Sequence, residues 1–337
     1  YFGGGAPSGL VVDRIDYSND TATAVAKGPL SLARSLLRAT GNSSFGYFGG
    51  GSSVSTVDRI DYSNDTATAS VERPLSVAGS ALAASSARAN ALSNLILAPS
   101  GSPTNFGTGA VATPNTGYFG GGHPAYSTVD RIDYSNDTAT ASVRGSLSAA
   151  RYYFGATGNS SFGYFGGGEV STVVDRIDYS NDNATASPKG PLTQGRSAAA
   201  TGNSSYGYFG GGRAPGNVTT VDRIDYSNDT TTATPKGPLT VARGILGATG
   251  NSSYGWFGGG YPTVATVDRI DYANDTVTAP SRTAMTVARG LFSATGNKDY
   301  GYYGGGYTPT ELSTVDRLDY ANDTVFLSTK GPLSIVR

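Results

Sequence analysis

The sequence predicts an all-β protein, a closed ring of seven four-stranded blades of the kind called a β-propeller, and three observations support this. An aromatic pair followed by three glycines occurs seven times, starting at Tyr1, Tyr47, Tyr118, Tyr164, Tyr208, Trp256 and Tyr302. The differences between these positions are 46, 71, 46, 44, 48 and 46 residues, a period typical of propeller blades. Short runs of β-branched and aromatic residues lie between Gly, Pro, Asn and Asp, as in strands joined by turns.

The second repeat illustrates the elements that we expect in each blade. Residues 35–40 form a first strand, which the turn pair Gly41-Asn42 joins to a second strand over 45–50. After a variable loop, residues 56–62 form a third strand, and a turn at 63–65 leads to a fourth strand over 66–69. Two such hairpins make one four-stranded blade. The glycine triplet suits a strand end where neighbouring backbone comes too close for a Cβ atom.

The order of these motifs resembles the kelch repeat. The order is aromatic-x-Gly-Gly, a variable loop, Val-x-Arg-hydrophobic-Asp, an Asn-containing turn and Pro-Leu-[Ser/Thr]-x-Ala-Arg, and it covers all of the chain except one insertion. Kelch repeats usually carry a tryptophan after the second turn, where this chain has small residues such as Ala67. We therefore expect other aromatic residues to pack the blades together. The near-identical repeats also resemble those of repeat proteins from marine bacteriophages.

We expect residues 1–337 to form a single propeller domain, with an insertion over 79–115 between the second and third blades. Leu82, Ala89, Leu92 and Ile96 have helical spacing, which predicts a short amphipathic helix on the same face as the variable loops. The first strand occurs only six times. We expect a seventh copy just outside the two ends of this sequence, in a longer chain or assembly, since an unclosed blade would expose a strand edge.

Composition narrows the range of functions. The formal net charge is -1 and the basic residues form no runs, so we expect no nucleic-acid partner. No apolar run approaches the ~18 residues that cross a bilayer, so we expect no membrane insertion. Cysteine is absent, which excludes disulfides and thiolate chemistry.

Most charged residues follow the repeat, which indicates a structural role. Asp58, Arg59 and Asp61 represent positions that we expect to form ion pairs or backbone hydrogen bonds, and Asp65 is expected to cap its own turn. A calcium loop at this turn is the less favoured alternative, since one turn supplies too few ligands.

A second set of repeated arginines ends the Pro-Leu-[Ser/Thr] stretch. The kelch resemblance implies that they line the channel mouth and contact acidic ligands, because guanidinium groups bind carboxylates well. The favoured alternative is that each one holds loop carbonyls together. The candidate ligand-binding residues in this set are Arg34, Arg151, Arg196, Arg243 and Arg289.

The sequence does not support catalysis or a cofactor. His123 is the only histidine, so a multi-histidine metal site and a Ser-His-Asp triad are not expected. The glycine triplets lack the following Lys-[Ser/Thr] of a phosphate-binding loop. We therefore expect no enzyme activity, no cofactor and no metal.

The loops after the glycine triplets differ while everything around them repeats, so we expect them to bind the partner. Candidate contact residues in these loops are His123, Tyr126, Arg213, Tyr261, Tyr307 and Glu311. The favoured function is a non-catalytic binding or structural module in a virion or cell-surface fibre, outside the cell, which recognises a glycan or a protein. Two alternatives remain: an intracellular adaptor that reads an acidic peptide through the arginine ring, and a propeller enzyme that acts on sugars.

Overall fold

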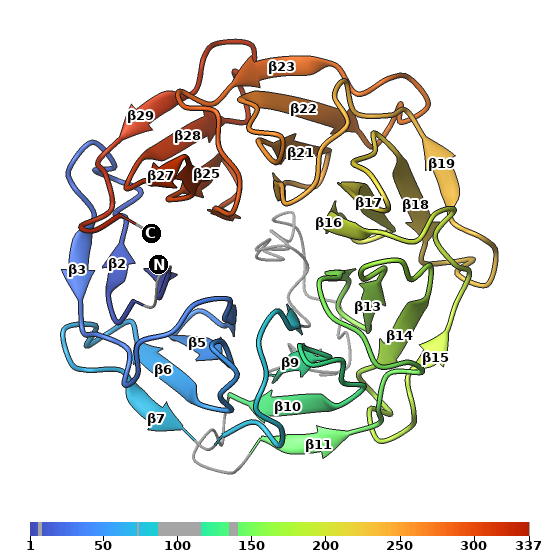
Figure 1. Cartoon of the computed structure of the whole chain (residues 1–337), viewed down its shortest axis with the longest axis horizontal. Coiled ribbons are helices and arrows are strands. Elements are labelled where there is room, and N and C mark those ends of the chain that lie inside the picture. The colour runs from blue at the N-terminus through green and yellow to red at the C-terminus, as the bar shows by residue number, and fades with distance from the viewer. Residues whose placement is uncertain (6–8, 73, 87–115, 135–140, 337) are drawn as a thin grey trace, which may run out of the picture.

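The computed structural model describes residues 1–5, 9–72, 74–86, 116–134 and 141–336. These residues form seven antiparallel sheets arranged as blades around an axis (Figure 1). The sheets contain β-strands only, and no helix occurs in the described residues. The predicted all-β propeller with seven blades is therefore confirmed.

Six blades have four strands in simple up-and-down order, and the first has three. The first blade contains β1 (Phe2–Gly3), β2 (Val12–Arg14) and β3 (Val25–Lys27). The second contains β4 (Arg38–Gly41), β5 (Phe45–Gly49), β6 (Val57–Asp61) and β7 (Ser70–Glu72). The third contains β8 (Ala83–Ser86), β9 (Thr116–Gly120), β10 (Val129–Asp133) and β11 (Ser142–Arg144).

The remaining four blades repeat this pattern. The fourth contains β12 (Gly155–Gly158), β13 (Phe162–Gly166), β14 (Val174–Asp178) and β15 (Ser187–Pro188). The fifth contains β16 (Ser197–Gly202), β17 (Tyr206–Arg213), β18 (Val221–Asp225) and β19 (Thr234–Lys236). The sixth contains β20 (Gly247–Gly250), β21 (Tyr254–Gly258), β22 (Thr266–Asp271) and β23 (Ser281–Ala284). The seventh contains β24 (Ser293–Gly296), β25 (Tyr300–Gly304), β28 (Val315–Asp319) and β29 (Ser328–Lys330).

The strands of the second blade follow the prediction with two shifts. The first strand is β4 at 38–41, whereas the sequence predicted 35–40. The fourth strand of the second blade is β7 at 70–72, whereas the sequence predicted 66–69. Residues 66–69 instead contact the preceding blade: the Ala69 amide donates to Pro29 O at 2.8 Å. A Cβ atom on Gly28 would lie 1.4 Å from Ala67 O, so glycine is required at this contact.

The glycine triplet works as predicted. A Cβ atom on Gly49, the first glycine of its triplet, would lie 2.7 Å from the Phe119 ring of the next blade. Gly50 and Gly51 follow with φ of 64° and 90°, values that side-chain-bearing residues rarely adopt. The triplet therefore lets adjacent blades approach and turns the chain into the variable loop.

One aspartate holds each described junction between blades, as between the fifth and sixth. The Tyr208 hydroxyl donates to Asp275 Oδ2 at 2.7 Å, and Arg223 Nη1 donates to the same oxygen at 2.8 Å. Lys236 Nζ lies 3.1 Å from Asp275 Oδ1. The Tyr208 ring also stacks on Tyr272 with centroids 4.7 Å apart. Asp65 and its counterparts thus bind the preceding blade, which corrects the predicted role as a cap of their own turn.

Asp61 caps the turn instead, since its Oδ1 accepts the Ser63 amide at 2.8 Å. The prediction that other aromatic residues pack the blades is confirmed, because one stacked aromatic pair spans each of the seven junctions. These pairs are Tyr1/Tyr62, Tyr47/Tyr134, Tyr118/Tyr179, Tyr164/Tyr226, Tyr208/Tyr272, Trp256/Tyr320 and Tyr302/Tyr17.

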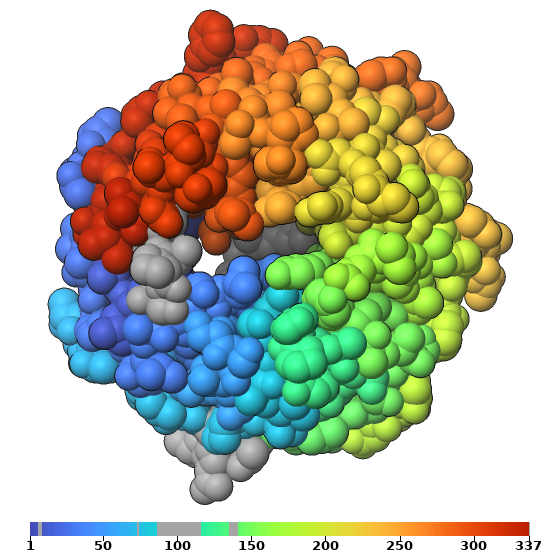
Figure 2. Space-filling model, viewed as in Figure 1, coloured from blue at the N-terminus to red at the C-terminus, as the bar shows by residue number. Residues whose placement is uncertain are grey.

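The same contacts close the ring between the last and first blades. The Tyr302 hydroxyl and Arg317 Nη1 each donate to Asp20 Oδ2 at 2.8 Å, and Tyr302 stacks on Tyr17. In the space-filling view the C-terminal blade lies directly against the N-terminal blade (Figure 2). Closure therefore uses the same chemistry as the internal junctions.

The structure corrects part of the predicted insertion over 79–115. Residues 83–86 form β8, the innermost strand of the third blade, which pairs with β9. The part of the insertion after β8 therefore lies between two strands of one blade. The ends of β8 and β9 that flank it lie at the face opposite the loops that follow the glycine triplets, and not at the predicted face. Residues 87–115, which include most of the predicted helix, lie outside the described residues.

We expect alkali to unfold the protein, because tyrosines are buried at the junctions between blades. Burial, reinforced by the hydrogen bond to Asp182, raises the pKa of Tyr118 from 10.0 to about 12, and burial raises the pKa of Tyr208 further. Because the folded pKa exceeds the unfolded value, the stabilisation is complete below pH 10 and is lost as the pH rises toward 12. We expect tyrosinate absorbance and loss of β-sheet circular dichroism to follow one cooperative transition in this window. Tyrosinate formation in a protein that keeps its β-sheet signal would contradict this.

Candidate functional site

The variable loops and the connections between blades meet at one face, which we call the loop face. Both kinds of segment lie at the same end of the strands, since each follows a strand that runs toward that end. Short backbone bridges join them: His123 pairs with Ser80, Tyr126 with Arg151, and Tyr261 with Gly244. The loop face is therefore a connected surface supported by the propeller.

The structure places the predicted loop residues on this face. Tyr261 is 58% exposed and Tyr307 is 44% exposed. His123 and Arg213 are exposed, whereas Tyr126 and Glu311 are half-buried. Tyr307 and Glu311 come together because β26 (Tyr307–Thr308) pairs with β27 (Thr310–Glu311). Of the other predicted residues, His123 and Tyr126 belong to the third blade, Arg213 to the fifth and Tyr261 to the sixth, so the set is spread around the loop face.

The predicted ring of ligand-binding arginines is corrected by the structure. Arg243 is 0% exposed; its Nη2 lies 3.0 Å from Asp268 Oδ2 and donates to Phe257 O at 2.9 Å. Burial lowers the pKa of Arg243, and the Asp268 carboxylate partly offsets this. The other members are buried in the same way and bind equivalent aspartates: Arg34, Arg151, Arg196 and Arg289.

These arginines therefore bind backbone carbonyls, as the alternative prediction stated for loop carbonyls such as Thr56 O, and they also neutralise buried carboxylates, which the sequence did not predict. They are unavailable to a ligand from solution, which removes the basis for an adaptor that reads acidic peptides through an arginine ring.

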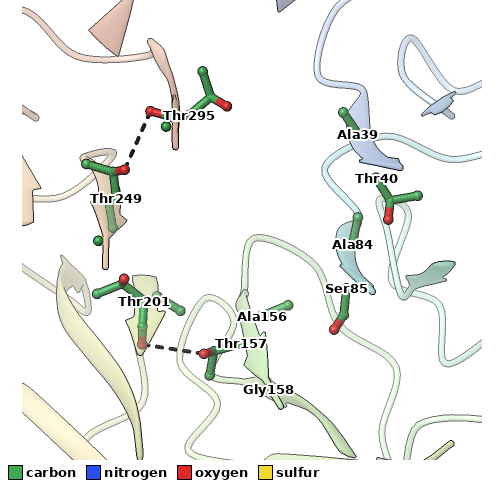
Figure 3. Close-up of a pocket in the computed structure, with 14 residues that line it drawn as sticks. Ala39, Thr40, Ala84, Ser85, Ala156, Thr157, Gly158, Thr201, Thr249 and Thr295 are labelled. Carbon is green, nitrogen blue, oxygen red and sulfur yellow. Dashed lines mark hydrogen bonds between the residues drawn. The ribbon is translucent and has the colours of Figure 1, made fainter. Parts of the chain in front are cut away.

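A cavity of about 390 Å³ follows the axis of the ring. Its walls come from the innermost strands, and the close-up shows threonine side chains of neighbouring blades side by side (Figure 3). Thr157 and Thr249 each donate to the carbonyl of the equivalent threonine in the next blade, at 3.4 and 3.5 Å. The wall contains only Ala, Thr, Ser and Gly, so the described cavity presents no charged side chain to a ligand.

Four side chains form a separate cluster on the loop face between the third and fourth blades. The His123 and Tyr152 rings meet edge to face with centroids 4.9 Å apart, and the Tyr153 ring lies 5.1 Å from Tyr152. The Tyr152 hydroxyl donates to Glu169 Oε1 at 2.5 Å, which raises the pKa of Tyr152. We call these residues, His123, Tyr152, Tyr153 and Glu169, the junction cluster.

Sequence reasoning selected His123 but missed the two tyrosines. Tyr152 and Tyr153 follow Arg151, at positions where the second blade begins with Ser35 and Leu36. That departure from the repeat was the available signal. The sequence alone does not show that these connections meet the loops after the glycines, because the two segments are joined only in the folded ring.

The described residues contain neither a candidate metal-binding cluster nor a helix that could span a membrane. No group of three His, Asp or Glu side chains in these residues could hold a metal ion. No helix among them is long and apolar enough to cross a membrane.

Comparison with known proteins gives the fold alone. No protein-family model matches the chain. No curated protein matches its sequence significantly. Among solved structures, the structure of YjhT is similar with a TM-score of 0.64 and 9% sequence identity, over 90% of this chain and 99% of that chain. At this identity the likeness supports the propeller architecture and carries no information about ligands.

Proposed function

We propose that the protein is a non-catalytic binding module that recognises a glycan or another protein through its loop face. The main support is that sequence variation is concentrated on this face, while the scaffold below it repeats. Exposed aromatic side chains such as Tyr261 and Tyr307 lie there on a rigid support, and tyrosine gives large contact area at low entropic cost.

Absence of catalysis is part of the proposal. The repeated aspartates and arginines form ion pairs within a blade and between neighbouring blades, so their charges stabilise the ring. Catalysis would instead require ionisable groups that converge on a substrate pocket. The axial cavity is lined by small uncharged residues.

We further propose that the repeats are kelch-like and that the module acts outside the cell, in a virion or cell-surface fibre. The order of the motifs and their use in four-stranded blades support the first part. Uniform repeats that build a rigid ring with one variable face suit a fibre component, which would present that face to its target as part of a larger chain or assembly.

The experiment is a binding screen on glycan and protein arrays with the labelled protein. We expect the double variant Tyr261→Ala/Tyr307→Ala to bind its array target about tenfold more weakly or worse, since exposed aromatic anchors dominate such contacts. Lys298→Ala is the matched control, because Lys298 lies in an exposed turn between β24 and β25 at the opposite face. Equal loss of binding in both variants would contradict the proposal.

A further inference from the structure

Among the described connections between blades, only the one at the junction cluster carries two adjacent aromatic residues after the repeated arginine position. The residue after the repeated arginine position is Tyr152 here and Ser or Gly elsewhere, at Ser35, Ser80, Ser197, Gly244 and Gly290. The next residue is Tyr153 here and aliphatic elsewhere, at Leu36, Ala81, Ala198, Ile245 and Leu291. Two adjacent rings therefore replace small or aliphatic side chains at a single junction, where the scaffold does not require them.

The backbone brings the cluster together from three segments. His123 follows the glycine triplet of the third blade, and its amide donates to Ser80 O at 2.7 Å. Glu169 follows the triplet of the fourth blade, where Gly168 has φ of 112° and a Cβ atom would lie 2.9 Å from Tyr152 O. This close approach lets Glu169 reach the hydroxyl of Tyr152. The site is thus assembled by the same glycine geometry that builds the ring.

The exposed surfaces of the cluster combine aromatic faces with a carboxylate. Tyr153 is 43% exposed, and His123 and Glu169 are exposed. Glu169 accepts the Tyr152 hydrogen bond through Oε1, and its side chain is otherwise exposed. One carboxylate oxygen is thus available to accept hydrogen bonds beside an aromatic surface.

We propose that the junction cluster is a subsite for a neutral saccharide. A sugar ring presents an apolar C–H face that stacks on an aromatic ring, while its hydroxyl groups donate to a carboxylate in charge-assisted hydrogen bonds. This inference rests on the proposed function, because it names the ligand class for one part of the loop face.

Other ligand classes fit the cluster less well. An apolar protein segment would bury the Glu169 carboxylate without a hydrogen-bond donor, which is costly. An anionic ligand would be repelled by the same carboxylate. A quaternary ammonium ion favours rings that surround it, but neighbouring rings here pack edge to face with centroids 4.9 and 5.1 Å apart, which leaves no space for the ion between them.

The test is saturation-transfer NMR and titration with a panel of neutral methyl glycosides and short neutral oligosaccharides. The key variant is Tyr152→Ser/Tyr153→Leu, which installs the Ser35-Leu36 pair that the second blade already carries and so leaves the scaffold intact. We expect saturation transfer to at least one saccharide with the wild-type protein, and affinity about tenfold or more weaker in the double variant. Glu169→Gln should also weaken binding, whereas Lys298→Ala should not.

The outcomes separate this inference from the proposed function. Absence of saccharide binding by the wild-type protein would overturn the inference. Unchanged affinity in the folded double variant would do the same, and so would preferential binding of tetramethylammonium or of an array protein at the cluster. If binding were lost only in Tyr261→Ala/Tyr307→Ala, the inference would fail while the proposed function survived. Ligand binding that resisted every loop-face variant would remove the proposed function itself.

Discussion

Replacement of Arg243 with methionine is expected to lower the free energy of unfolding by about 3 to 5 kcal/mol. The change leaves the Asp268 carboxylate buried at 0% exposure without its cation, although Thr240 still donates to it through its amide and hydroxyl. The Phe257 carbonyl also loses its guanidinium donor. Chemical denaturation followed by circular dichroism measures the effect.

A second variant separates lost charge pairing from lost packing volume. Arg243→Met/Asp268→Leu removes both charges, so its stability should recover part of the loss, because a buried pair can be replaced by apolar groups at little cost. Loss of ligand binding in Arg243→Met at unchanged stability would contradict the structural role and revive the arginine ring as a binding site.

Replacement of Asp275 with asparagine is expected to cost about 3 kcal/mol, the low end of the range for a broken buried pair, because its partner Arg223 is partly exposed. The carboxylate accepts hydrogen bonds from Tyr208 and Arg223 and forms an ion pair with Lys236. An amide has one oxygen and presents its NH2 group to the remaining donors, so at least one of them loses its acceptor. The midpoint of thermal unfolding should fall accordingly.

Asp271→Asn is the matched control for this variant. Asp271 belongs to the same repeat but caps an exposed turn, where its Oδ1 accepts the Ala273 amide at 2.9 Å. Asparagine caps such turns equally well, so stability should change by about 0.5 kcal/mol or less. Equal effects of the two substitutions would mean that the inter-blade aspartate does not carry the junction.

The repeat made the fold predictable from sequence. Seven aromatic-glycine triplets at blade spacing fix the number of blades, and the turn pair Gly41-Asn42 marks the hairpin between β4 and β5. The first strand occurs six times in the sequence, and accordingly one blade among the described residues has three strands. The number of blades and the turns between strands depend on residues close together in the sequence, so the repeat pattern shows them directly.

Contacts between blades were less predictable, because they join residues far apart in the chain. Asp65 and Tyr1 are 64 positions apart, and nothing local distinguishes Asp65 from a turn cap. The burial of Arg34 likewise depends on Asp58 in the following blade. The place of Tyr152 in the junction cluster was not predictable for the same reason, since it depends on contacts with His123 and Glu169 from other segments.

In the proposed function, ligand binding belongs to the face where the repeats differ. Hydrogen–deuterium exchange of the free and ligand-bound protein tests this most directly, with any ligand found in the array screen. We expect protection in peptides that cover the loops after the glycine triplets and the connections between blades, including 122–126, 151–154 and 167–170. Protection confined to the Gly-Asn turns and the Asn-Asp turns of the opposite face would contradict it.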